Sequence, residues 1–578
     1  MSSRAGPVHV VTTSRTYKGR TYQTHLLRRS YRDGDKVRNQ TVGNISHLPA
    51  RVIDLIRRSL AGHSFICAQD HFDILASRSH GHVQAVLLAT RELGLDKLIS
   101  TTACRERNLV VAMIVARILE PQSKLATTRW WKTTTLPDEL CVGDADEDEL
   151  YRAMDWLLPR QERIEKKLAK RHLQEGGLVL FDLTSSYFEG SKCPIAAFGH
   201  NRDGKKGKLQ VNYGLLTNGQ GCPVSVSVFP GNTGDSKTLL PEATKVQKRF
   251  GVKSLVLVGD RGMISQTQID ELQKRDGVQW ITALRSEGIR KLLEEGYVQL
   301  GLFDEKSLFE LTHPDFPGER LVACRNPELA WHRAQKRKAL LEATEKELAK
   351  VASMVANGRL RGKDVIGVRV GRAVNKYKVA KHFELRIEEQ SFEFKIHQER
   401  VEAEAALDGL YVIRTCVPRE ELSAEDAVRS YKALSGVERA FRSFKTIDLK
   451  VRPIRHWSEE RVRSHIFLCM LAFYVQWHMQ ERWRPLLFAD EDQEAKNRRD
   501  PVAPARRSKK ALEKVRTRTL EDETSAHSFR TLLTELSTIV RNTCRTKETT
   551  ADEPTFDLVT NMTPKQREAL GLLDTIDV

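Results

Sequence analysis

The spacing of hydrophobic positions changes along this chain, and the change separates helical from strand-forming segments. Between residues 81 and 118, apolar residues recur every three or four positions in HVQAVLLATRELGLDKLI and RNLVVAMIVARIL, which predicts amphipathic helices. Between residues 176 and 285, short runs rich in Val, Leu and Ile are separated by Gly and Pro, which predicts β-strands. These runs are LVLFDL, VNYGLLTN, VSVSVFP, SLVLVGD and VQWITAL.

The order of these segments predicts a mixed α/β core. The first three strand-like runs follow each other closely, as in an antiparallel meander, and the helical stretch PEATKVQKRFGV precedes LVLVGD. Residues 328–356 predict a long charged helix, and FELRIEE and FEFKIHQERVEAE then predict strands, so we expect an insertion here. Helical patterns return at SAEDAVRSYKALSGVERAFRSFK and at residues 464–480.

Length and charge add a partner class to this picture. A chain of 578 residues exceeds what one hydrophobic core usually supports, so several domains or large insertions are expected. The net charge of +18 and the isoelectric point near 9.4 favour a polyanionic partner, of which nucleic acid is the commonest. A basic protein with no specific partner is the alternative.

Two classes of protein are not supported by the sequence. The apolar stretch HIFLCMLAFYVQWHM has about 15 residues, short of the roughly 20 that a bilayer requires, so it predicts a buried helix. The segment MSSRAGPVHVVTTS lacks the apolar core of a signal peptide, and we expect a cytoplasmic protein with no membrane partner.

The nine cysteines include no CxxC pair, which predicts reduced structural thiols and neither a zinc ribbon nor a disulfide framework.

Two aspartates end strand-like runs and are candidate metal ligands. Asp182 ends LVLFDL, and Asp260 ends LVLVGD. A carboxylate at the carboxyl edge of a sheet is well placed to meet a ligand, and Mg²⁺ prefers oxygen ligands. Two such ions about 4 Å apart promote phosphodiester transfer. The alternative is an aspartate that caps a turn or a helix.

A third carboxylate follows in YKALSGVERAFRSFK. Tyr431, Glu438 and Lys445 are spaced by seven residues, and seven steps of an α-helix return to within about 20° of the same direction. All three, together with Arg442, are therefore expected on one helix face, where Glu438 would hold a metal and the cations would hold phosphate. An ordinary amphipathic helix with solvated charges is the alternative.

These blocks resemble the bacterial insertion-sequence DDE transposases. The resemblance is to the cut-and-paste group with the signature Tyr-x2-Arg-x3-Glu-x6-Lys, an RNase H-like core and a β-strand insertion before the last catalytic residue. It rests on FDLTSSYFEG, VGDRGMIS and YKALSGVERAFRSFK, supported by VFPGNTGDSKTL and DGLYVIRT, and spans roughly residues 80–480. One position departs: Leu434 stands where the signature has Arg, so Arg442 or Arg439 would take that role.

The resemblance implies a catalytic, metal-binding triad of Asp182, Asp260 and Glu438. The implied cofactor is two Mg²⁺ ions, with Mn²⁺ as a substitute. Tyr431 and Lys445, and with them Arg442, would contact the backbone of the transposon end.

Four further residues carry weaker expectations. Arg261 would orient Asp260 or touch phosphate, with a plain surface arginine as the alternative. Trp280 would trap a flipped base, although a core tryptophan is the favoured interpretation. Asp203 and Asp235 are interpreted as turn residues, and Asp235 is the rival ligand should Asp260 not bind metal.

The fold expected from pattern and resemblance is α/β. It comprises an RNase H-like mixed-sheet catalytic core with a β-rich insertion, an N-terminal, mostly helical DNA-binding region and a helical C-terminal region. The expected domains are a basic strand or arm region at 1–80, a helical DNA-binding domain at 81–175, the first part of the core at 176–290, the insertion at 291–405, the second part of the core at 406–480, and a basic linker with a helical region at 481–578.

The function implied is that of a transposase. It would bind the terminal inverted repeats of an insertion sequence and catalyse Mg²⁺-dependent DNA cleavage and strand transfer into target DNA. A homodimer on paired ends, in the cytoplasm and associated with the bacterial nucleoid, is implied with it. The alternatives are an RNase H-like nuclease without strand transfer and a transposase-derived DNA-binding protein.

Overall fold

The computed structural model describes residues 6–33, 36–63, 65, 72–303, 306–546 and 555–576. The chain separates into two compact units: Met1–Ser77 with Arg541–Val559, and Arg78–Val540 with Thr560–Val578. None of the eight cysteines in the described residues forms a disulfide, and Cys67 lies outside those residues.

The first unit is built on short antiparallel sheets. One sheet has the order β1-β2-β3, and α1 packs on β1 through Ile53, which is buried. The second sheet has the order β16-β15-β4. The elements are β1 (Val8–Tyr17), β2 (Arg20–Asp33), β3 (Lys36–Asn44), α1 (Ala50–Leu60), β4 (Phe72–Ser79), β15 (Val540–Thr546) and β16 (Phe556–Val559).

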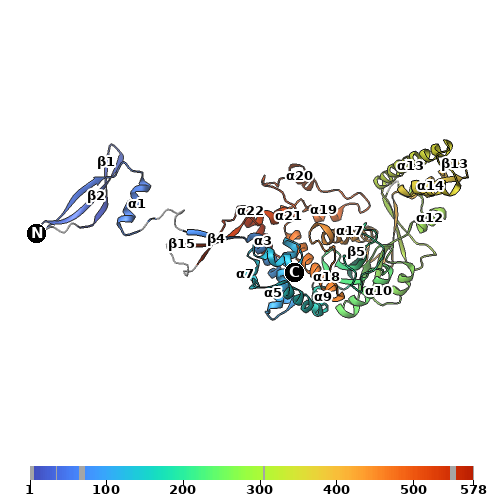
Figure 1. Ribbon diagram of the computed structural model, residues 1–578, viewed down its shortest axis with the longest axis horizontal. Coiled ribbons are helices and arrows are strands. Elements are labelled where there is room, and N and C mark those ends of the chain that lie inside the picture. Colours follow the sequence, from blue (N-terminus) through green and yellow to red (C-terminus); the bar gives the residue numbers. More distant parts are fainter. Residues whose placement is uncertain are drawn as a thin grey trace. The chain divides into compact units, whose positions relative to one another are not determined.

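Helices from both ends of the second unit form one apolar core (Figure 1). Two of them, α5 and α18, are apolar on all sides and are buried along most of their length, as expected for helices at the centre of a core. The structure confirms that HIFLCMLAFYVQWHM forms a buried helix. In the described ranges no helix is long and apolar enough to cross a membrane.

The bounds of these helices are as follows: α3 (Gly81–Glu92), α4 (Leu95–Ile99), α5 (Arg105–Leu119), α6 (Lys124–Trp131), α7 (Leu136–Leu140), α8 (Glu147–Leu157), η1 (Leu158–Arg160), α9 (Gln161–His172), α18 (Glu459–Arg482), η6 (Arg484–Leu486), α19 (Gln493–Arg498), α20 (Lys509–Thr517), α21 (Phe529–Leu536) and α22 (Pro564–Leu573).

A mixed sheet lies beside this helical core, as predicted for an α/β chain. In the described residues it has eight strands in the order β10-β11-β14-β9-β8-β5-β6-β7, and β5, β8 and β9 run parallel. The predicted antiparallel meander is confirmed by the pairing of β6 with β5 and β7. All four residues of β8 are buried, which suits a central strand covered on both faces.

The strands of the sheet and the helices between them are β5 (Gly177–Tyr187), β6 (Gln210–Asn218), β7 (Pro223–Pro230), α10 (Ser236–Thr244), η2 (Lys245–Phe250), β8 (Leu255–Val258), α11 (Gln266–Leu272), β9 (Val278–Ala283), α12 (Ser286–Glu294), η3 (Leu300–Phe303), β10 (Leu308–Leu311), β11 (Arg320–Arg325) and β14 (Leu410–Thr415).

An arm with its own hydrophobic core is inserted between β11 and β14. It comprises α13 (Pro327–Ala356), α14 (Lys363–Tyr377), η4 (Ala380–His382), β12 (Phe383–Ile387), β13 (Phe392–Ile396) and α15 (Gln398–Ala405), and α13 and α14 pack side by side (Figure 1). The long helix predicted at 328–356 is confirmed.

The base of the arm is closed by a backbone hydrogen bond and by an ion pair between Arg337 of α13 and Asp408. The Asn326 N–H donates to the Gly409 carbonyl at 2.9 Å, and Arg325 and Leu410 are register partners in β11 and β14. Gly409 has a φ of +74°, and a side chain there would collide with the Asn326 carbonyl. The arm therefore leaves and rejoins the sheet where two neighbouring antiparallel strands could have been joined by a hairpin turn.

Candidate active site

Asp182 and Asp260 lie at the same level of two adjacent parallel strands. In the register of β5 and β8, Leu180 pairs with Val258, an offset of 78 (258 − 180), and Asp260 follows Asp182 by the same 78 (260 − 182). Because β8 ends at Val258, both carboxylates lie just beyond its carboxyl end. The register thus brings together the two aspartates expected to share a site.

The prediction that Asp182 ends its strand is wrong. β5 continues to Tyr187, because the residues after Asp182 keep their antiparallel pairing with β6. Only the pairing with β8 stops before Asp182. The Asp182 Oδ1 atom accepts a hydrogen bond from the Leu183 N–H at 2.8 Å.

Asp260 is held in a turn and by a tyrosine. Its carbonyl accepts hydrogen bonds from the N–H groups of Met263 and Ile264, at 2.9 and 3.0 Å. Its Oδ1 atom accepts one from the Tyr431 hydroxyl at 3.2 Å. Burial raises the pKa of Tyr431, and the adjacent Asp260 charge raises it further, so the phenol stays protonated and donates.

Glu438 comes from a helix that packs against β5. The two segments that carry the third acidic block are α16 (Ala424–Lys432) and α17 (Leu434–Arg442). On α17, Val437 and Phe441 are buried, and the ring of Phe441 meets Tyr213 edge-on at 5.9 Å. Glu438, next to Val437, is exposed.

Asp260 and Glu438 lie close enough to Asp182 for their charges to act on its ionisation. Burial is the main cause that raises the pKa of Asp182 to about 6. The negative charges of Asp260 and Glu438 raise it further, and the positive charge of Arg202 partly offsets them. A half-buried carboxylate beside two like charges favours a hard divalent cation as a partner, and the oxygen donors present fit Mg²⁺.

Lys445 does not share the helix face of Glu438. A π-helix, η5 (Ser443–Ile447), follows α17, and its wider turn moves Lys445 away from the register of an α-helix. The Ser443 hydroxyl donates to Asp448 at 2.6 Å within this segment. The prediction of one continuous helix face from Tyr431 to Lys445 is therefore wrong, because α16 and α17 are separate helices divided at Ala433 and η5 changes the register after Arg442.

Asp203 lies in a turn, as predicted, and its side chain is also buried in a cluster of ion pairs. Its side chain is 2% exposed, and its Oδ1 atom lies 2.9 Å from the Lys445 ammonium and also contacts Arg452. Its Oδ2 atom accepts from the Tyr187 N–H at 2.9 Å. Burial lowers the pKa of Lys445, and the pairing with Asp203 partly restores it. Nothing in the sequence indicated this pairing across 242 residues.

Asp235, the expected rival ligand, has a cation of its own. It precedes α10 and forms an ion pair with Arg202. The same Arg202 lowers the pKa of Asp182, so this arginine links the loop to the acidic site. The sequence analysis did not single out Arg202 or Arg452.

The other predicted residues differ in exposure. Arg261 and Arg442 are exposed. Trp280 lies in the centre of β9 and is 0% exposed, so its indole is not available to stack on a base, and the core interpretation holds. Leu434, at the signature Arg position, is buried at 8% exposure, because this face of α17 packs on the core.

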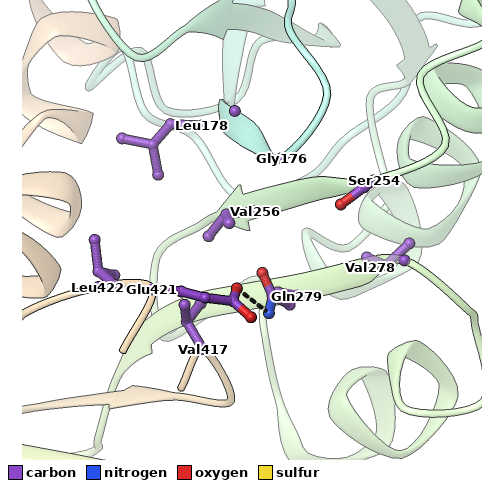
Figure 2. A pocket seen from close by; sticks show the side chains of 11 residues that line it. Gly176, Leu178, Ser254, Val256, Val278, Gln279, Val417, Glu421 and Leu422 are labelled. Carbon is purple, nitrogen blue, oxygen red and sulfur yellow. Dashed lines mark hydrogen bonds between the residues drawn. The ribbon is translucent and has the colours of Figure 1, made fainter. Parts of the chain in front are cut away.

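A cavity of about 460 Å³ lies near the amino-terminal ends of the central strands (Figure 2). It is lined by residues at the starts of β5, β8 and β9, and the Gln279 amide donates to Glu421 across it at 2.9 Å. Because Asp182 and Asp260 lie toward the carboxyl ends of these strands, the cavity is separate from the acidic group.

Comparison with known proteins adds independent findings. Residues 174–475, which is 302 of the 578 residues (475 − 174 + 1), match the family described as "Transposase DDE domain". Residues 10–69 match "IS1634 family transposase, N-terminal domain". No curated protein matches the chain. A similar solved structure is the cryo-EM structure of the piggyBac transposase synaptic complex with hairpin DNA, at 8% identity and a TM-score of 0.32 over 79% of this chain and 76% of that one.

Proposed function

This chain belongs to the DDE transposases of insertion sequences, and we propose that it binds the terminal inverted repeats of its element and catalyses DNA cleavage and strand transfer. The observation that carries the proposal is the register that sets Asp182 beside Asp260, with Glu438 close enough to act on the same pKa. In this proposal the mixed sheet is the RNase H-like catalytic core.

Divalent metal ions are general cofactors of DDE transposase domains. We propose two Mg²⁺ ions, with Mn²⁺ as a substitute, held by Asp182, Asp260 and Glu438. When bound, such a pair lowers the pKa of the attacking water and neutralises the leaving oxygen. Among the described residues, these three carboxylates do not form a trio with all donor atoms within 4.8 Å of one another.

The protein side chains contribute position and charge. Asp182 is fixed by strand pairing, and the Tyr431 hydroxyl orients Asp260. In this proposal Arg261 and Arg442 bind DNA phosphates near the acidic group, which is supported by their exposure. For Lys445, the proposed contact with the transposon end requires its ammonium to leave Asp203.

The partners in this proposal are the transposon ends, target DNA and a second copy of the chain on paired ends. The positive charge of +18 supports DNA binding through phosphates. The first unit contributes to it, since its residues 10–69 match a transposase N-terminal domain.

An Asp260→Ala variant tests the proposal. Without this carboxylate, Mg²⁺-dependent cleavage of a transposon-end duplex should fall below detection while binding of the same duplex persists, measured by gel assay and by fluorescence anisotropy. Asp270→Ala is the matched control and should cleave as the wild type does, because Asp270 is exposed on α11 and lies outside the triad. Mg²⁺-dependent cleavage by Asp260→Ala would show that the triad is wrong.

Strand transfer needs its own assay. A pre-cleaved end with a free 3′-hydroxyl should be joined to target DNA by the wild-type chain. Cleavage without joining would favour a nuclease over a transposase.

A further inference from the structure

A second group of ligand-type side chains lies away from the acidic site. The donor atoms of His172, Cys222 and His478 all lie within 4.8 Å of one another, and among the described residues this is the trio that meets that criterion. The three come from the end of α9, the turn between β6 and β7, and α18. Cys222 is 0% exposed and His478 is 8% exposed.

The distances within the trio match those of metal ligands. Tetrahedral bonds of about 2.3 Å to sulfur and 2.0 Å to nitrogen place the two ligand atoms about 3.5 Å apart. The Cys222 Sγ atom lies 3.7 Å from His478 Nε2, so little movement is needed to admit an ion. The His172 Nε2 atom lies 2.9 Å from the Tyr474 hydroxyl, a partner of the kind that orients ligand imidazoles.

The protonation of the two imidazoles also suits a metal. Burial lowers the pKa of His172 to about 4 and that of His478 to about 3, and neighbouring Arg171 and Arg482 add to the effect. Both rings are therefore neutral at pH 7 and offer a nitrogen lone pair. Burial raises the pKa of Cys222, with a contribution from Glu481, so the thiol is protonated when no metal is bound.

We propose that His172, Cys222 and His478 bind one Zn²⁺-type ion, with a water at the fourth position. Binding forms a bond from sulfur to the metal, and the thiol proton leaves to solvent. Imidazole nitrogens and a thiolate are ligand types that bind Zn²⁺, and they differ from the oxygen donors of the acidic site.

The position of this site indicates a structural role. Asn218, which precedes the Cys222 turn, pairs with Val179, whereas Asp182 pairs with Leu215 further along β5. The trio thus lies toward the amino-terminal end of β5, away from the carboxylates. A bound ion would join α9, the β6–β7 turn and α18, which otherwise meet only through packing and hydrogen bonds.

Metal binding by the full-length chain tests the site. The wild-type chain, stripped with chelator and titrated anaerobically with Co²⁺, should show one equivalent bound with a thiolate-to-cobalt charge-transfer band. Zn²⁺ should displace the Co²⁺ and abolish that band. Cys222→Ser and His478→Gln should each weaken Zn²⁺ binding at least tenfold, measured by competition with a chromophoric chelator.

Cys469→Ser is the matched control. Cys469 is a buried thiol on α18, the helix that also carries His478. Its Sγ atom lies 4.0 Å from His465 Nε2, and it does not belong to the trio. The control should bind Zn²⁺ as the wild type does, with circular dichroism reporting the fold of each variant. A wild-type chain with no charge-transfer band, or an equal loss in Cys469→Ser, would overturn the site. Asp260→Ala should keep full Zn²⁺ binding, which separates this result from the outcome for cleavage.

Discussion

At the scale of single residues, Asp182 combines two demands that oppose each other. Strand pairing and burial hold its carboxylate in place, but burial also disfavours its charge and raises its pKa to about 6. The cost is present only when the group is ionised and no cation is bound. The metal-free fold is therefore less stable than it would be with a neutral side chain at this position, but the carboxylate is held where it can bind a cation.

Asp182→Asn should therefore stabilise the metal-free chain. The pKa of Asp182 rises from 3.8 to about 6 on folding. The folded wild type therefore bears no cost from this group below pH 3.8, and the free energy of unfolding falls as the pH rises from 3.8 through about 6. The variant, which carries no charge, should exceed the wild type by about 3 kcal/mol at pH 8 and by about 1 kcal/mol at pH 4.5. Urea unfolding in EDTA at both pH values measures the difference. A gap that is the same at both would contradict the assignment.

At the scale of elements, the segment after α17 shows what the sequence could and could not predict. The short apolar runs in the sequence predict the strands that lead to Asp182 and Asp260. The register of β5 and β8 has an offset of 78, equal to the spacing of the two aspartates, and therefore brings them side by side. The spacing of seven predicted a regular helix, and it fails where Ser443–Ile447 widens into a π-helix. Such a bulge depends on tertiary partners, here Gln476 of α18, whose side-chain amide donates to both Ser443 and Asp448, and no helical period records these contacts.

Burial was equally hard to predict for single side chains. Trp280 is apolar enough for either a core or a base contact, and only its place in the centre of the sheet decides for the core. Asp203 looked like a turn residue because glycines surround it, yet distant Lys445 and Arg452 neutralise it. Contacts of this kind arise from topology, so local sequence does not contain them.

The Asp203 cluster should stabilise the junction between its loop and η5. Asp203→Asn leaves Lys445 and Arg452 without their carboxylate in a largely buried place, which should cost about 3 kcal/mol. Asp235→Asn removes the more exposed Arg202 pair, where Asp235 is 39% exposed, and should cost about 1 kcal/mol or less. Urea unfolding of both variants compares them. Equal losses would show that the Asp203 cluster is no more than a surface ion pair.

The arm between β11 and β14 should respond to mutation as a unit of its own. Leu348 is 0% exposed in the arm's core, so Leu348→Ala should destabilise the arm by about 2–5 kcal/mol. Val368→Ala, at a position 58% exposed, is the control and should have little effect. Amide hydrogen exchange should quicken in α13 and α14 but not in β5 or β6. Faster exchange in β5 would mean that the arm and the sheet share one core.

At the scale of the whole molecule, we expect the positive charges of the N-terminal sheet to contribute to DNA binding. Arg15, Lys18 and Arg20 are exposed on the N-terminal sheet. If all three contact phosphates, their replacement by Ala should lower the slope of log K against log salt by about 2.7. Binding to a transposon-end duplex across a salt series measures the slope.

The control for this prediction removes the same charge elsewhere. Lys166, Lys170 and Lys248 are exposed on α9 and the adjoining segment η2, and their replacement by Ala should leave the slope unchanged. An equal change in both variants would show that the positive charge acts diffusely and that the N-terminal sheet has no special part in it.

The closed base of the arm makes it an interchangeable module. Since Asn326 and Gly409 are already joined by a hydrogen bond, the sheet meets the whole arm as it would meet a hairpin loop, and the entropy of closing a loop grows only slowly with its length. Arms of quite different size could be exchanged at this joint without shifting the strands on either side. The arm, residues 326–409, supplies 84 (409 − 326 + 1) of the 177 residues between Asp260 and Glu438 (438 − 260 − 1), so nearly half of that separation measures the module, while the site it separates is local.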